Sequence, residues 1–324
     1  MANLSIKYAG LKLKNPLIAA SSGLTNSLKK IQELEKAGVS AIVLKSLFEE
    51  QIDNHSKKLN LTSDYPEASD YINAYVEMNH VEKYLNLIRA SKDSCKTPII
   101  ASINCYKVAR WIDFAKNIEE AGADALELNI FLINTGEFGD NYLEDSYIKI
   151  VREIKKVIKI PIIIKIARSI SNLPGLIKKL AALDVDAVVL FNRFYQLDID
   201  INSMKITSGP VFSNPSDFSE TLRWTAITTG FVPEIDVACS YGVHYWEDVI
   251  KGILTGASAI QLCSVLYEEG LQIIPQIISN LTNWMEENNY TSIEQFKGKL
   301  NYSNISSPAM YERAQFMKYF SNHQ

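Results

Sequence analysis

Short apolar runs alternate with amphipathic stretches along most of the chain, and this alternation predicts repeated β–α units. One such run, from Ala125 to Leu128, follows a helical stretch that ends in Ala121 and Gly122. A strand that helices cover on both faces is apolar at consecutive positions, as this run largely is. The pattern therefore favours a parallel sheet flanked by helices.

The turn that joins helix to strand recurs in nearly the same form. Residues 37–41, 121–125 and 255–259 read Ala-Gly-Val-Ser-Ala, Ala-Gly-Ala-Asp-Ala and Thr-Gly-Ala-Ser-Ala, and residues 183–187 are a looser copy. Glycine ends a helix readily because it adopts the left-handed conformation at little cost. Repetition of this turn predicts a closed (β/α)8 TIM barrel. An open doubly wound sheet, which uses similar turns, is the alternative.

Eight strands are expected from the apolar runs. They are placed at residues 17–20, 42–45, 98–103, 125–129, 161–166, 188–192, 233–238 and 259–262. Residues 4–13 alternate in polarity, which predicts an N-terminal hairpin at the bottom of the barrel. Residues 49–80 and 193–218 are expected to be loop insertions on the C-terminal face. Helical spacing resumes at Val81, and a further helix is expected over 147–157. No linker interrupts the pattern, so residues 1–324 are expected to form one domain.

The composition narrows the class of function. The chain has 324 residues, which suits a barrel with insertions, and its net charge of −4 does not favour nucleic acid or anionic lipid as a partner. No apolar run reaches the ~20 residues of a membrane span, and the N-terminus does not resemble a signal peptide. The four cysteines are widely spaced, which disfavours a metal or disulfide framework. We expect a cytoplasmic enzyme for a small-molecule substrate, without a metal.

Polar residues occupy the carboxyl ends of the expected strands, where barrel enzymes keep their chemistry. They include two lysines and three asparagines: Ser21, Lys45, Asn104, Asn129, Lys165 and Asn192. Metal catalysis is not expected, since ligand clusters are missing. Hydrolysis by a Ser/His pair is not expected either, because the histidines at positions 55, 80, 244 and 323 fall in loops or in the tail.

The loops after the seventh and eighth strands suit a phosphate group. In (β/α)8 barrels these loops lead into helix N-termini and bind phosphate through backbone N–H groups. Gly242 and the Cys263-Ser264 turn supply such groups here. Together with the lysines and amides they favour an aromatic cofactor that carries a phosphate. A phosphosugar enzyme without flavin is another interpretation.

Several segments, in this order along the chain, resemble the dihydroorotate dehydrogenases, which are FMN-dependent barrels. The segments are Asn15 to Ser21, Lys45-Ser46, and residues 121–129, 160–165, 222–224 and 256–261. The resemblance covers roughly residues 4–280. It implies an FMN-dependent oxidoreductase that exchanges a hydride between flavin and a CH–CH bond of a pyrimidine-like substrate, dihydroorotate or orotate, in pyrimidine biosynthesis. It also implies a homodimer.

The resemblance assigns roles to individual residues. Lys165 is expected at the N1–C2=O edge of the flavin, and Lys45 beside flavin and substrate with a catalytic role. The implied substrate contacts are Lys45, Asn73, Asn129, Asn134 and Asn192. The implied cofactor contacts are Ala20, Ser21, Lys45, Ser46, Asn104, Asn129, Lys165, Asn192, Gly209, Tyr241, Gly242, Cys263 and Ser264.

One departure from the family concerns proton transfer. The family's loop after the fourth strand reads Glu-Leu-Asn-Leu-Ser-Cys-Pro-Asn, and its cysteine (serine in the membrane-linked class) removes the substrate's proton. Here the loop reads Glu-Leu-Asn-Ile-Phe-Leu-Ile-Asn over 127–134, which places Leu132 at that position. Leucine cannot accept a proton, so the alternative is a flavin-binding homologue that acts on another substrate or serves as a binding module. Cys105 is the nearest candidate for a replacement base.

Overall fold

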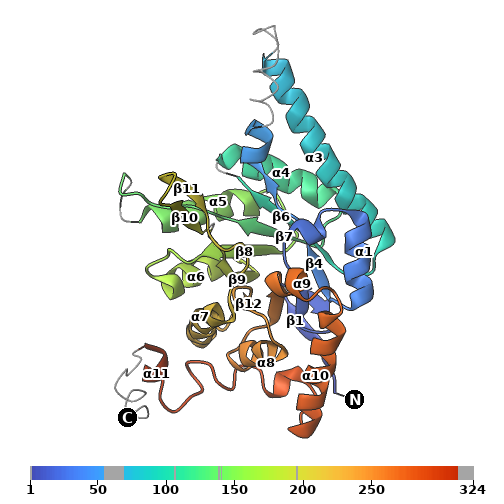
Figure 1. Ribbon diagram of the computed structural model, residues 1–324, viewed down its shortest axis with the longest axis vertical. Coiled ribbons are helices and arrows are strands. Elements are labelled where there is room, and N and C mark those ends of the chain that lie inside the picture. Colours follow the sequence, from blue (N-terminus) through green and yellow to red (C-terminus); the bar gives the residue numbers. More distant parts are fainter. Residues whose placement is uncertain are drawn as a thin grey trace.

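Eight parallel strands form a closed ring in the part of the chain that the computed structural model describes, residues 2–54, 69–105, 107–137, 139, 141–194 and 196–312 (Figure 1). The strands are β3 (Leu17–Ala19), β4 (Ala41–Val43), β6 (Ile99–Asn104), β7 (Ala125–Asn129), β8 (Ile162–Ala167), β9 (Ala187–Asn192), β12 (Asp236–Cys239) and β13 (Ala259–Leu262). The ring closes because β13 pairs with β3 and β4 pairs with β6. The expected (β/α)8 barrel is confirmed, and the open sheet is excluded.

Helices surround the ring (Figure 1). They are α1 (Leu28–Ala37), α3 (Ser69–Ser94), α4 (Val108–Glu120), α5 (Tyr142–Lys155), α6 (Leu173–Ala181), α7 (Phe218–Phe231), α8 (Trp246–Leu254) and α10 (Ile273–Glu287). Shorter helical elements are α9 (Ser264–Glu268), α11 (Ala309–Glu312) and the 3-10 turns Gly23–Thr25, Pro215–Asp217 and Ile293–Gln295. In α4, for example, Trp111, Phe114 and Ile118 are buried at helical spacing.

The recurring helix-to-strand turns have the geometry that their glycines predict. Gly38, Gly122 and Gly256 have φ angles of 109°, 91° and 107°, so each occupies the left-handed region that ends a helix. The looser copy uses Asp184 at φ 57°, a residue that tolerates this region better than most. One local rule therefore sets where these four strands begin.

An N-terminal hairpin of β1 (Ile6–Tyr8) and β2 (Leu11–Leu13) covers the amino end of the barrel, as expected. Its turn is attached to the start of β12, because the Ala9 N–H donates to the Asp236 carboxylate at 2.9 Å. Tyr8 is fully buried beneath the barrel interior. This end of the barrel is therefore closed, and ligand access is left to the carboxyl ends of the strands.

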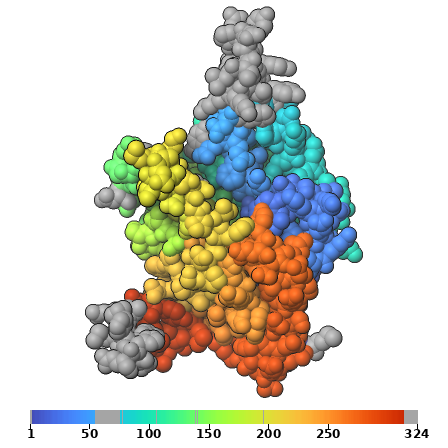
Figure 2. Space-filling view, in the orientation of Figure 1, coloured from blue at the N-terminus to red at the C-terminus, as the bar shows by residue number. Residues whose placement is uncertain are grey.

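Both insertions contain more regular structure than expected. Helix α3 begins at Ser69, earlier than the expected Val81, because no single apolar stripe runs along the whole helix to mark its start. Outside the two insertions, helix α5 also begins earlier than expected, at Tyr142 and not at 147. The second insertion contains an antiparallel hairpin of β10 (Leu197–Asp200) and β11 (Lys205–Ser208), yellow in Figure 2, whose residues are all exposed. The two-residue strand β5 (Leu47–Phe48) extends the pairing with β6.

None of the described helices is both long enough and apolar enough to span a membrane.

Candidate functional site

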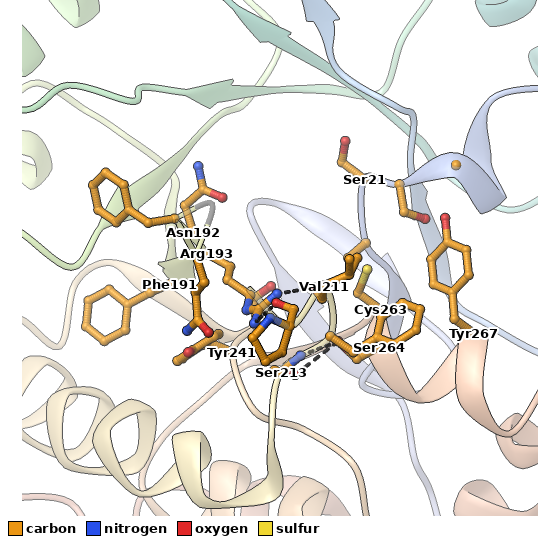
Figure 3. Close-up of a pocket in the computed structure, with 18 of the residues that line it drawn as sticks. Ser21, Phe191, Asn192, Arg193, Val211, Ser213, Tyr241, Cys263, Ser264 and Tyr267 are labelled. Carbon is orange, nitrogen blue, oxygen red and sulfur yellow. Dashed lines mark hydrogen bonds between the residues drawn. The ribbon is translucent and has the colours of Figure 1, made fainter. Parts of the chain in front are cut away.

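A pocket of about 640 Å³ lies at the carboxyl ends of the strands, a volume typical of small-molecule sites (Figure 3). Its walls come from the ends of β3, β8, β9, β12 and β13 and from residues 208–213. Eight of the thirteen cofactor contacts implied by the resemblance line it: Ala20, Ser21, Lys165, Asn192, Gly209, Tyr241, Cys263 and Ser264. Residues that are distant in sequence thus meet around one cavity.

Lys165 is a buried ammonium group at the pocket wall, with only 7% of the residue exposed. Its Nζ donates to Gln261 Oε1 at 3.1 Å and lies 4.0 Å from Glu127 Oε1. Gln261 also donates from Nε2 to Glu127 Oε2 at 2.8 Å, so it bridges the two charges. A buried charge is tolerated when it is paired and hydrogen-bonded. The bridge therefore maintains a positive charge beside the pocket.

Two asparagines flank the strand that carries Lys165. Asn192 Nδ2, at the end of β9, donates to Asn129 Oδ1, at the end of β7, at 2.6 Å. Asn129 is buried behind this bond, whereas Asn192 lines the pocket. The bond fixes how both amides are presented on this side of the cavity.

A serine chain supports the opposite wall. Ser21 Oγ accepts from Ser46 N at 2.9 Å, and Ser46 Oγ lies 2.7 Å from Ser102 Oγ. Ser46 is buried behind Ser21 and does not line the cavity. In this structure Ser46 therefore supports the 640 Å³ pocket through Ser21 and does not border it.

The structure does not bring every expected residue to the pocket. Lys45 is exposed and lines a separate cavity of about 230 Å³, together with His80 and Lys83. Asn134 is bonded within its own loop, since it donates to Gly139 O at 3.2 Å and accepts from Gly136 N at 3.0 Å. The remaining residues are placed as follows: Asn104 ends β6 without lining the pocket, and the Asn73 side chain lies outside the described residues.

Gly242 supports the pocket without lining it. Its φ is 83°, and a Cβ atom there would lie 2.3 Å from Phe218 N, the first residue of α7. Glycine is therefore required for two reasons, the left-handed backbone and the close approach of the helix. Its neighbour Tyr241 lines the pocket and stacks under Arg168, whose guanidinium carbon is 5.0 Å from the ring centre.

Sequence reasoning missed a cluster at the same end of the pocket. Ser213 Oγ lies 3.0 Å from both His244 Nε2 and Ser264 Oγ, and His244 Nδ1 lies 3.2 Å from Glu268 Oε2. The sequence-based prediction concerned hydrolysis by a Ser/His pair, and this hydrogen bond does not contradict it. His244 does lie in a loop, but the fold buries it against a serine 31 residues earlier. No local pattern marks a contact between two loops.

Arg193 was also missed. Its guanidinium donates to Pro210 O at 2.7 Å and to Val211 O, so it holds residues 208–213 over the pocket. Arginine is suited to this role because its planar fork can bond two carbonyls at once.

Leu132, which stands at the position of the family's catalytic base, cannot act as a base. Leu132 is half-buried and packs against the core. Cys105 is buried and does not line the pocket. Burial, together with the Glu49 carboxylate, raises the pKa of the Cys105 thiol well above its usual range. A thiol in this state is a poor proton acceptor near neutral pH, which argues against Cys105 as a replacement base.

Among the described residues, no group of three or more His, Cys, Asp and Glu side chains is placed to hold a metal ion. The polar groups that line the pocket are an ammonium, a guanidinium, amides, hydroxyls and the Cys263 thiol.

The barrel and this pocket define an α/β-barrel protein with a polar pocket of small-molecule size at the strand ends. The chain belongs to the dihydroorotate dehydrogenase family, whose model matches residues 3–285. The resemblance seen in the sequence is thereby confirmed. The family consists of flavin-dependent oxidoreductases, and this chain is accordingly a dehydrogenase that acts on CH–CH groups.

Relatives match the chain over almost their whole length. A protein of Thermoplasma volcanium is 30% identical, with 92% of this chain and 98% of that protein covered. One of Thermoplasma acidophilum is 28% identical, with 92% and 99% covered. Both are named dihydroorotate dehydrogenase B (NAD(+)), catalytic subunit. A putative dihydroorotate dehydrogenase A (fumarate) of Aeropyrum pernix is 24% identical, with 91% and 96% covered.

Replacing Gly242 by alanine should destabilise the protein more than replacing Gly122. Both glycines have positive φ, but a Cβ at Gly122 meets nothing within 4 Å. Gly122→Ala should therefore cost about 1 kcal/mol of unfolding free energy from the backbone alone, and Gly242→Ala roughly 1–3 kcal/mol more from the clash with α7. Urea unfolding of the two variants measures the difference, and equal costs would contradict the close approach of α7.

Proposed function

We propose that this chain, as a single-domain enzyme, binds FMN in the 640 Å³ pocket and exchanges a hydride between the flavin and a CH–CH bond of a pyrimidine-like substrate, dihydroorotate or orotate, in pyrimidine biosynthesis. The observation that carries this proposal is Lys165, a buried ammonium at the pocket wall that Gln261 bridges to its counter-charge Glu127. The names of the relatives support the substrate.

The donors around the pocket suit a flavin nucleotide. When bound, the flavin supplies a ring that accepts a hydride. Lys165 would hold the electron-rich edge of that ring, and Asn192, fixed by Asn129, would bond a planar polar partner. Tyr241, Cys263 and Ser264 line the other end, where a phosphate would be held. The contacts of Lys45, Asn73, Asn104 and Asn134 stay predictions of the family resemblance.

The first test is spectroscopic. Purified protein should show the absorbance of bound flavin, and dihydroorotate added without oxygen should bleach it. Cys105→Ser should bleach at the same rate as the wild type, because the buried thiol of Cys105 takes no part. Flavin binding without bleaching would direct the search to other substrates, as Leu132 suggests. Failure to take up FMN would refute the proposal.

Substitution of Lys165 should shift the redox balance of the bound flavin. Lys165→Ala removes a charge-assisted bond worth roughly 1.5–3 kcal/mol, which corresponds to a potential lower by about 30–60 mV for a two-electron couple. A dye-linked titration measures the potential. Lys156→Ala, which removes an exposed lysine paired with Glu153, should leave it unchanged. An unchanged potential in Lys165→Ala would remove that residue from the flavin site.

We also propose a homodimer in the cytoplasm. All four cysteines are free, in keeping with a reducing compartment. The β10–β11 hairpin lies at the surface (Figure 2). Its paired residues Ile199 and Ile206 are 59% and 75% exposed, and cross-strand partners share one face. Apolar faces of this kind are typical of association surfaces.

The dimer proposal predicts a mass of two chains in solution. Ile199→Asp with Ile206→Asp should yield monomers, whereas Thr207→Asp, on the opposite face of β11, should not. Analytical ultracentrifugation distinguishes these outcomes, and a monomeric wild type would refute the dimer.

A further inference from the structure

The side chains of Glu268, His244, Ser213 and Ser264 form a continuous chain of hydrogen-bonding groups, here named the hydroxyl relay. It starts at Glu268 Oε2, 3.2 Å from His244 Nδ1, and continues from His244 Nε2 to Ser213 Oγ at 3.0 Å. Ser213 Oγ then donates to Ser264 Oγ at 3.0 Å. Ser213 and Ser264 line the pocket beside Cys263, so the relay ends at the cavity wall (Figure 3).

Burial separates the two ends of the relay. His244 and Ser213 are each 8% exposed and Ser264 is 9% exposed, whereas the Glu268 side chain is 39% exposed. The carboxylate therefore reaches solvent, and the hydroxyls face the pocket. Inside a protein the hydrogen bonds of such a chain polarise one another, so a change in the protonation of His244 alters the polarity of the Ser264 hydroxyl.

The number of protons on His244 determines the direction of the hydrogen bonds along the relay. Ser264 Oγ accepts from both Ser213 N (3.1 Å) and Ser213 Oγ, which leaves its own proton to donate into the pocket. Ser213 has a single hydroxyl proton, and this proton goes to Ser264 only when His244 Nε2 carries a proton and donates to Ser213. With Nδ1–H directed at Glu268, that arrangement requires imidazolium.

The neutral imidazole reverses the chain. If only Nδ1 is protonated, Nε2 is an acceptor and takes the Ser213 proton away from Ser264. Protonation of His244 thus places a positive charge behind Ser213 and leaves the Ser264 proton directed at the pocket. In the neutral relay this charge is absent, and Ser264 can turn its proton to Ser213 Oγ instead. An anion at the pocket end favours the protonated form, and a neutral ligand has no such preference.

The charges around His244 and the pocket end are compatible with this coupling. Asp248, on α8, accepts from His244 N at 3.1 Å through Oδ2, while its Oδ1 bonds Lys251. Burial raises the pKa of Cys263, and the positive charges of Lys165 and Arg193 oppose that rise. Carboxylates thus lie behind the imidazole, and positive potential lies on the pocket side.

We propose that the hydroxyl relay makes phosphate binding in this pocket proton-coupled: the phosphate of FMN, seated at Ser213 and Ser264, binds together with a proton taken up by His244. His244 and Glu268 are positioning residues, since they act through Ser213. This inference rests on the proposed binding of FMN and adds the group that confers preference for the phosphorylated flavin.

The experiment compares FMN with riboflavin, which lacks the phosphate. Affinities of the flavin-free protein are measured by flavin fluorescence between ~pH 5 and ~pH 8, the range in which histidine side chains generally change charge. The ratio of FMN to riboflavin affinity should fall by about 10-fold or more across this range, as expected when a hydrogen bond to a charged group is lost. The second ionisation of the phosphate, near pH 6, would change the ratio in the opposite direction and is common to all variants.

Variants assign the effect to the relay. His244→Gln should flatten the pH dependence of the ratio, and Ser213→Ala should also flatten it while retaining the imidazole. Glu268→Gln should move the fall to lower pH, because the imidazolium loses its counter-charge. Ser216→Ala, an exposed serine of the same insertion, is the matched control and should behave as the wild type.

The outcomes separate this inference from the proposed function. Wild-type protein that binds neither flavin overturns both. Wild-type protein that binds both flavins with a flat ratio overturns the relay alone. Full pH dependence of the ratio in His244→Gln or in Ser213→Ala would likewise overturn the relay alone.

Discussion

The central constraint on this structure is the burial of the Lys165 ammonium inside a closed barrel. Removing such a charge from water costs several kcal/mol unless partners replace the lost solvation. Here Gln261 accepts from the ammonium and donates to Glu127, so strands β8, β13 and β7 are joined across the barrel. Strand β13 reaches the others only because the sheet closes on itself. Ring closure and a charged pocket wall therefore depend on each other.

Around this charge the pocket has two chemically different ends. The amides of Asn129 and Asn192 lie on the strands beside Lys165, where a planar ligand can exchange directed hydrogen bonds. The hydroxyls of Ser213 and Ser264 lie at the other end, on the insertion after β9 and the turn after β13. Arg193 ties that insertion down through backbone carbonyls. The barrel supplies the first end and the loops supply the second, as is usual where loops on a rigid scaffold carry function.

The sequence was sufficient for the barrel because its signals are local. Consecutive apolar positions marked the strands, and glycine at Gly38, Gly122 and Gly256 marked the turns, since only a left-handed residue ends those helices compactly. The pocket residues at strand ends were predictable for the same reason, as parallel strands bring their carboxyl ends to one face. The first turns of α3 were missed because no single apolar stripe marks them.

What the sequence by itself determined is the barrel, the family and the strand-end lysine and amides of the pocket. Only the tertiary structure decided which polar groups bond to one another. Ser213 and His244 lie in separate loops, and Gln261 bonds Glu127, a residue 134 positions earlier in the sequence. It also placed Lys45 in a second cavity and buried Cys105 away from the pocket. Hydrogen bonds act over a few ångströms in space, and loop conformation, which no periodicity encodes, sets those distances.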